Sequence, residues 1–386
     1  MKVLSPTLDF NPGVISKLPI NNLPFKRVQK EKVVEQLISL SKKDWDAYER
    51  SWDFKKNPLL DEKLHTPSLE DTYRSLREEW QAMTNEMKRL EEENNRIFIE
   101  EYGLSQELTP DVPLKEITLT CNPRYRYPAN RGRQYDPEKA EKRLLADTMK
   151  EFISYAVGCM FGRYAIDKDG LILANKGEGL AEFLEKVPEP AFMPDEDNAI
   201  PMLETEWFPD DIVERFKKFL RVTFGEERFR DNLRLIEDAI GKDIRKYFFK
   251  DFIKDHTKTY NKRPIYWLFS SPKKHFNVLV YMHRYRSDTP SVVLNSYLRP
   301  YKTKLEESRE HLKKVSTDET MAKKDRTNAD KEIDKITDIL KDLRDYEKNH
   351  LHPLAAERPD IDLDDGVKEN YARFGSVLYP IKGLNK

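Results

Sequence analysis

The stretch from residue 291 to residue 351 reads SVVLNSYLRPYKTKLEESREHLKKVSTDETMAKKDRTNADKEIDKITDILKDLRDYEKNHL and predicts an antiparallel pair of helices. Apolar residues recur in it every three or four positions, which places them on one face of each helix. The first seam comprises Leu294, Leu298, Tyr301, Leu305, Ser308, Leu312 and Val315, and the second comprises Ile333, Ile336, Leu340 and Leu343. Residues 316–328 lack this spacing and predict the tip of a helical hairpin. Pro300 predicts a kink in the first arm or a helix that starts there.

A further seam predicts a long helix over residues 69–102. It comprises Tyr73, Leu76, Trp80, Met83, Met87, Leu90, Asn94 and Ile97. The spacing is that of heptads, and the polar Asn94 within it could fix the register of a helical partner.

Shorter signals predict the remaining elements. Asp136-Pro137-Glu138 and Pro209-Asp210-Asp211 are typical helix starts, and Gly241 is a typical helix end. Residues 264–269 and 276–281 are β-branched and aromatic with a turn between them, which predicts a β-hairpin. The expected fold class is therefore mainly α, with a long antiparallel helical hairpin and a small β element.

Composition limits the classes of function. The chain has 386 residues and a formal net charge of −1, so attraction to nucleic acid must come from local patches. Its two cysteines cannot form a disulfide framework, and no CxxC pair occurs. No signal peptide and no apolar run of about 18 residues is present, so we expect a cytoplasmic protein without membrane contact.

Motifs for catalysis and metal binding are weak or missing. The patterns GxxxxGK[ST], GxGxxG, GxSxG and HExxH are all absent. The run Asp360–Asp365 does not fit an EF-hand loop and indicates a solvated acidic turn. His275 and His283 have basic rather than acidic neighbours in the sequence. His350 and His352 favour a helix C-terminus, where they interact with the helix dipole, over the alternative of metal binding. We therefore predict no catalytic residue and no metal site.

Two segments have the charge that a nucleic-acid surface needs. Residues 122–135 contain four arginines, three tyrosines and no acid, and residues 256–304 contain ten lysines and arginines against one acid. The alternative is that these cations pair with the acid-rich remainder of the chain. The candidate DNA-binding residues are Arg124, Arg126, Arg131, Arg133, Lys262, Arg263, Lys273, Lys274, Arg284, Arg286 and Lys302.

The tetrapeptide Asn122-Pro123-Arg124-Tyr125 invites comparison with the Asn-Pro-Pro-Tyr motif of amino-methyltransferases. Arginine replaces the second proline, and no upstream glycine-rich turn is present for the methyl donor. We interpret the match as a coincidence rather than a catalytic site.

Longer strings carry a resemblance to a known family. They include IFIEEYGL (97–104), LTCNPRYRY (119–127), FISYAVGCMFGRY (152–164), RVTFG (221–225), GKDIRKYF (241–248), KRPIYWLFSSP (262–272), YMHRYR (281–286) and DLDDGVK (362–368). With these strings, residues 26–386 resemble the C-terminal region of PglX, also called BrxX, the adenine-specific DNA methyltransferases of BREX phage-defence systems. Pro128 and Pro300 depart from the family pattern.

The resemblance implies a fragment of a longer enzyme. The family's catalytic domain, which uses S-adenosylmethionine, would precede this chain, so we expect no catalytic or cofactor-binding residue here. The resemblance also implies four segments: 1–25, the tail of a target-recognition domain; 26–108, a helical spacer; 109–290, a mixed DNA-engagement region; and 291–386, the helical hairpin and tail. Expected partners are double-stranded DNA, the remainder of the same enzyme and other BREX proteins.

Two hypotheses follow for the function of the chain. In the first, it is a DNA-engagement and assembly module of an adenine-N6 methyltransferase, inactive alone because methyl transfer needs the missing half. In the second, it is a helical protein–protein scaffold without direct DNA contact.

Overall fold

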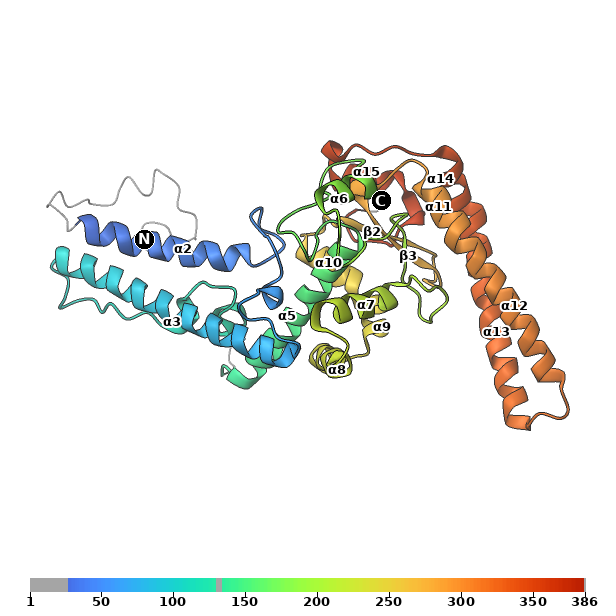
Figure 1. The fold of residues 1–386 in the computed structure, drawn as a ribbon, viewed down its shortest axis with the longest axis horizontal. Helices are drawn as coiled ribbons and strands as arrows, with labels where there is room; N and C mark the ends of the chain where they lie inside the picture. Colours follow the sequence, from blue (N-terminus) through green and yellow to red (C-terminus); the bar gives the residue numbers. More distant parts are fainter. Residues whose placement is uncertain (1–26, 130–133, 385–386) are drawn as a thin grey trace. The chain divides into compact units, whose positions relative to one another are not determined.

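A computed structural model describes residues 27–129 and 134–384 (Figure 1). The predicted target-recognition tail, 1–25, lies outside these residues. Among the described residues, 27–45, 78–129 and 134–140 form one compact unit, and 46–77 and 141–384 form a second.

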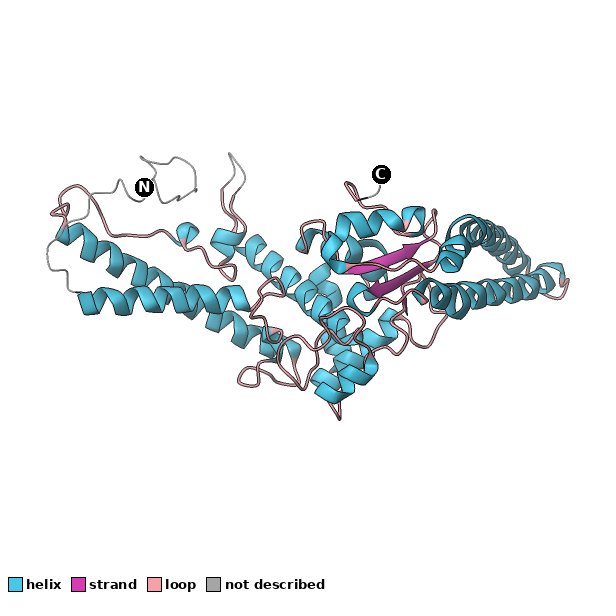
Figure 2. Ribbon diagram, turned by 90° about the horizontal axis from the view of Figure 1, so that it is seen from above, coloured by secondary structure: helices cyan, strands magenta, loops and turns pink. Residues whose placement is uncertain are grey.

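Helices dominate the described residues, as Figure 2 shows, and confirm the mainly α prediction. The α-helices are α2 (Arg27–Asp46), α3 (Leu69–Glu101), α4 (Pro123–Arg126), α5 (Pro137–Met160), α6 (Leu180–Lys186), α7 (Ile212–Phe224), α8 (Phe229–Ile240), α9 (Ile244–Tyr247), α10 (Ile253–Thr259), α11 (Thr289–Val292), α12 (Arg299–Thr317), α13 (Lys323–Tyr346), α14 (His352–Glu357) and α15 (Gly366–Arg373). Single turns of π-helix are η3 (Phe248–Phe252), η5 (Val293–Leu298) and η6 (Glu347–Leu351). Short 3₁₀ helices are η1 (Pro58–Leu60), η2 (Leu114–Glu116), η4 (Met282–Arg284), η7 (Leu363–Asp365) and η8 (Gly375–Val377).

The helix boundaries predicted at Asp136, Asp211 and Gly241 are confirmed. The Asp136 carboxylate accepts a hydrogen bond from the Lys139 amide at the start of α5. Asp211 accepts from the amides of Val213 and Glu214 at the start of α7. Gly241 ends α8 with a φ of 72°, a conformation that costs glycine no steric energy.

The first unit is organised by the seam predicted for the long helix. Trp80, Met83, Met87 and Leu90 on α3 are buried. Helix α2 lies beside this part of α3, and Lys43 of α2 pairs with Glu79 (Figure 1). Asp44 is buried and accepts hydrogen bonds from the amides of Thr120 and Cys121, which ties the following loop to α2.

The second unit contains the β element. Strands β2 (Tyr266–Ser270) and β3 (Asn277–Tyr281) form the predicted hairpin, with Tyr266 opposite Tyr281 and Ser270 opposite Asn277. A two-residue strand, β1 (Ile200–Pro201), pairs antiparallel with β3 on its other side. Every residue of β2 and β3 is buried, because helices of the second unit cover the sheet.

Helices α12 and α13 form the predicted antiparallel hairpin (Figures 1 and 2). Tyr301, Leu305, Ile336, Leu340 and Leu343 on their seams are buried. The tip is shorter than predicted, because α13 already begins at Lys323. The polar residues 323–328 include good helix formers such as lysine and arginine, and helix formation does not require apolar spacing.

Two prolines sit just after π turns. Pro300 follows η5 at the start of α12, and Pro353 follows η6 at the start of α14. In a π turn, the backbone hydrogen bonds span five residues instead of four. Each of these π turns lies next to a proline, which has no N–H to donate. The helix end predicted at His350 and His352 is therefore wrong, since the helical run continues to Glu357.

Replacing the hairpin tip should change stability little. Asp318, Thr320 and Met321 belong to the connection between α12 and α13, and Thr320 and Met321 are exposed. Replacing residues 318–322 by a Gly/Ser turn of the same length should alter the unfolding free energy by less than about 1 kcal/mol. Thermal melting followed by circular dichroism measures this. A loss of several degrees in melting temperature would show that the tip packs against other residues.

Candidate nucleic-acid interface

The structure separates the predicted DNA-binding residues into three groups. Arg131 and Arg133 lie outside the described residues. The second group is less accessible and comprises Arg126, Arg284 and Lys302. Arg284 is buried, Arg126 is partly buried, and Lys302 is partly buried and paired with Glu347. The exposed group comprises Arg124, Lys262, Arg263, Lys273, Lys274 and Arg286.

The arginine-tyrosine loop of the first unit is shaped by Asn122. Its side-chain oxygen accepts from the Arg124 amide and caps α4, while its nitrogen donates to the carbonyls of Leu114 and Ile117. Asn122 is buried and its amide is fully used, so the Asn-Pro-Arg-Tyr string is a helix cap in this fold.

Two arginines of this loop contact tyrosine rings. The guanidinium carbon of Arg124 lies 4.2 Å from the centre of the Tyr135 ring, and that of Arg126 lies 5.6 Å from the centre of the Tyr127 ring. Stacking restricts the arginine side chain while leaving its in-plane N–H groups able to donate. Because Arg124 is exposed, it remains able to contact phosphate.

The β-hairpin divides the basic cluster of the second unit. Lys262 and Arg263 precede β2, and Lys273 and Lys274 lie in the turn at its other end. A five-residue strand is about 17 Å long, so the two pairs lie at opposite ends of the sheet. The single basic surface predicted over residues 256–304 is therefore split by the antiparallel pairing.

Both pairs are presented by tight turns. Lys262 has a φ of 61°, and its amide donates to the Thr257 carbonyl after the end of α10. Lys274 has a φ of 64°, and its amide donates to the Ser271 carbonyl. Left-handed backbone is unfavourable for lysine, and the hydrogen bonds of the turns hold it in place.

Asp342 on α13 anchors the turn between β2 and β3. Its buried carboxylate accepts from the Ser271 hydroxyl at 2.6 Å and the Lys273 amide at 3.2 Å, and lies 3.1 Å from His275 Nδ1. The expectation that His275 has no acidic neighbour is therefore wrong, because Asp342 is distant in sequence but adjacent in space. The carboxylate holds the turn, and it orients Lys273 and Lys274 outward.

Arg284 does not belong to an exposed surface. It is 5% exposed, and its guanidinium donates to the carbonyls of Phe161, Asp195 and Glu196. Burial lowers the pKa of this arginine, although Asp195 and Asp197 oppose the shift. With both terminal nitrogens of its guanidinium donating to carbonyls, Arg284 ties two loops to the end of the sheet and does not belong to the interface.

Lys302 is neutralised inside the helical hairpin region. Its Nζ lies 2.5 Å from the Glu347 carboxylate, which also accepts from Arg299 Nε at 2.9 Å. Burial alone would raise the pKa of Glu347, but the hydrogen bonds from Lys302 and Arg299 bring it below its ordinary value. Glu347 thus remains charged and competes with any phosphate for Lys302.

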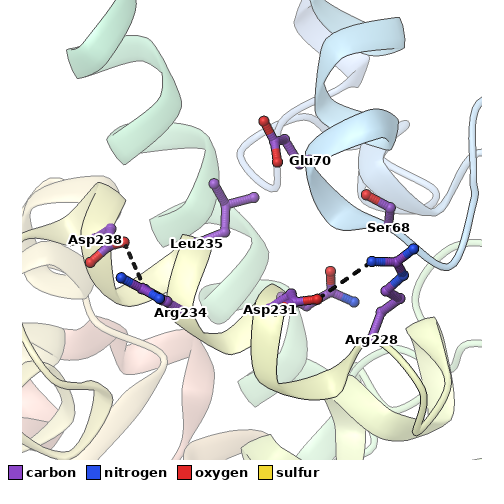
Figure 3. Close-up of a pocket in the computed structure, with 8 residues that line it drawn as sticks. Ser68, Glu70, Arg228, Asp231, Arg234, Leu235 and Asp238 are labelled. Atoms are coloured by element: carbon purple, nitrogen blue, oxygen red, sulfur yellow. Dashed lines mark ion pairs between the residues drawn. The ribbon is translucent and has the colours of Figure 1, made fainter.

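A surface cavity of about 280 Å³ lies in the second unit against α8 (Figure 3). Its charged groups pair with neighbours on their own helices: Arg228 with Asp231 at 3.5 Å and Arg234 with Asp238 at 3.7 Å. Asn232 beneath it is buried and accepts from the Leu69 amide at the start of α3. The cavity therefore presents paired charges rather than a reactive group.

Within the described ranges, no group of three or more His, Cys, Asp or Glu side chains is placed to hold a metal ion. None of the described helices has both the length and the apolar character to cross a bilayer.

Comparison with known proteins identifies relatives over almost the entire chain. No protein-family model matches it. The chain is 35% identical over 401 residues to adenine-specific methyltransferase BrxX of Escherichia coli O9:H4 (strain HS), and 35% identical over 399 residues to adenine-specific methyltransferase PglX of Lacticaseibacillus casei (strain Zhang). Each alignment covers 99% of this chain but only 32% and 31% of the respective relative. The resemblance predicted from the sequence is thus confirmed: the chain is a relative of the BrxX and PglX adenine-specific methyltransferases, over about a third of their length.

Proposed function

We propose that this chain is a DNA-engagement and assembly module of a BrxX/PglX-type adenine-specific methyltransferase. Its exposed basic residues would hold double-stranded DNA through phosphates, while its helices contact the remainder of the enzyme and other BREX proteins. The observation that carries the proposal is the set of exposed cations on helix α4 and on ordered loops of the second unit, namely Arg124, Lys262, Arg263, Lys273, Lys274 and Arg286.

The chemistry of methyl transfer is assigned to the part of the family's proteins that this chain does not match. S-adenosylmethionine would supply the methyl group there. The residues described here do not fit that cofactor, because the sheet is antiparallel and short and no glycine-rich strand-to-helix turn follows a strand. The occupied amide of Asn122 supports the same assignment.

Duplex binding should depend steeply on salt. The purified chain should bind a fluorescent duplex at 50 mM salt, with log affinity falling by about 0.9 per phosphate contact for each unit of log salt. Exchanging the six exposed residues for glutamine should weaken binding at least about 100-fold and flatten the slope. Fluorescence anisotropy across a salt series measures both quantities.

A matched control removes the same amount of charge from the helical hairpin region of the second unit. Lys314, Lys323, Lys324, Lys331, Lys341 and Lys348 are exposed on or beside the helical hairpin. Their exchange for glutamine should change duplex binding only slightly. Absence of binding by the folded wild-type chain at 50 mM salt would favour the scaffold hypothesis instead.

A further inference from the structure

A row of six lysines recurs at every fourth position before the β-hairpin. The lysine row comprises Lys242, Lys246, Lys250, Lys254, Lys258 and Lys262. All six side chains are exposed, and the middle four lie on the continuous helical run formed by α9, η3 and α10. Residues four apart on a helix are neighbours on its surface, so the row forms one edge of this run. The basic segment predicted from the sequence began at His256 and missed most of it.

The π turn helps to keep the row on one side. In an uninterrupted α-helix, each step of four residues overshoots a full turn by about 40°, so a long row would wind around the axis. The π turn η3, at Phe248–Phe252, holds more residues per turn, so a step through it rotates the row back.

The opposite face of the helical run is packed into the second unit. Tyr247, Phe248, Phe252, Ile253 and His256 are buried there. Because these side chains anchor the helix, the lysines cannot turn inward, and the row is presented to solvent as a fixed array.

The charge of the row is only partly neutralised. Residues 242–263 contain eight lysines and arginines against three aspartates. Asp251 pairs with Lys242 at 2.5 Å and Lys254 at 3.2 Å, and Asp255 pairs with Lys150 at 3.3 Å. Asp243 accepts from the amides of Arg245 and Lys246 as a helix cap. The remaining lysines of the row, namely Lys246, Lys250, Lys258 and Lys262, form no ion pair with a described acid.

The spacing of the row suits a polyanion with regular charges. From Lys246 to Lys258 the helical run is about 18 Å long, roughly five phosphate steps of one DNA strand. A lipid surface fits less well, because a membrane-bound helix inserts its apolar face, and here that face is buried in the protein. Lysine provides a flexible point charge that reads no base.

We infer that the lysine row is a sequence-independent contact site for the phosphate backbone of double-stranded DNA. This inference rests on the proposed DNA-engagement function. It adds a surface along α9, η3 and α10 that ends at the Lys262 turn and is distinct from Arg124 and from the turn between β2 and β3. The row would hold the duplex in place while leaving its bases to be read elsewhere.

The test uses a triple variant of the full chain, Lys246→Gln, Lys250→Gln and Lys258→Gln. These three lysines lack an acidic partner among the described residues, so their exchange breaks no ion pair. We expect duplex affinity at 50 mM salt to fall at least about tenfold, equally for duplexes of unrelated sequence. The salt slope should decrease by up to about 2.7, since each lost phosphate contact removes about 0.9.

The control is Lys323→Gln, Lys331→Gln and Lys341→Gln on α13, which removes the same charge from exposed positions. If wild-type binds duplex and both triple variants bind equally well, the lysine row is overturned while the DNA-engagement function stands. If folded wild-type does not bind duplex, both proposals fail. A third outcome is that the row variant loses binding to phosphatidylserine vesicles but keeps its binding to duplex. This result would assign the row to a lipid surface and overturn the inference.

Discussion

Replacing Leu340 with aspartate is expected to destabilise the second unit by at least about 4 kcal/mol. Leu340 on α13 is 1% exposed and lies in the cluster that includes Leu305, Ile336 and Leu343. The substitution removes about 2 kcal/mol of apolar burial and places a carboxylate in a buried apolar cluster. Such a group either remains charged at high cost or forces the hairpin to open.

Urea denaturation followed by far-UV circular dichroism measures this effect. The neighbouring exchange Lys341→Asp provides the control, because Lys341 is exposed and tolerates a change of charge. We expect the control to change the free energy of unfolding by less than about 0.5 kcal/mol. A silent Leu340→Asp would show that α12 and α13 do not pack through their predicted seams.

Replacing Arg284 with methionine should have the second-largest effect, a loss of about 3–5 kcal/mol. Methionine has a similar length but no donors, so the carbonyls of Phe161, Asp195 and Glu196 would lose their partner in a buried setting. The carboxylate of Asp195 nearby would also lose a compensating positive charge.

Arg286→Met is the matched control, two residues away and exposed. Thermal melting should separate the two variants clearly, with Arg286→Met near wild-type. The duplex-binding assay should show the reverse order: Arg286→Met weakens binding, and Arg284→Met, assayed at a temperature where it stays folded, does not. Equal stability of the two variants would contradict the buried role of Arg284.

The surroundings of the histidines are set by segments that are distant in the sequence. The sequence neighbours of His275 are basic, yet its ring lies 3.1 Å from Asp342, a residue 67 positions away. The sequence predicts a helix end at His350 and His352, but the π turn η6 continues the helical run into α14. Local charge and spacing do not report which distant element packs against a side chain.

The β-hairpin was predictable almost to the residue, since its strands are β-branched, aromatic and separated by a turn. The two-residue strand β1 was not, because so short a segment has no periodicity and exists only through its pairing with β3. The predicted tip of the helical hairpin is longer than the observed one, because α13 begins at Lys323 in a segment without apolar spacing. An exposed helix needs no apolar pattern.

The sequence by itself determined the helical class, the hairpin seams, the capped helix starts and the relationship to the BrxX and PglX proteins. These features depend on short-range periodicity, on caps within a few residues and on long shared strings. Only the tertiary structure decided which cations remain available for a ligand. Arg284 and Lys302 find partners at separations of 45 residues or more, while the lysines of the row between 246 and 258 are kept outward by the aromatic face buried behind them. Availability of a charge depends on what packs against it, and contacts between distant segments exist only in the folded chain.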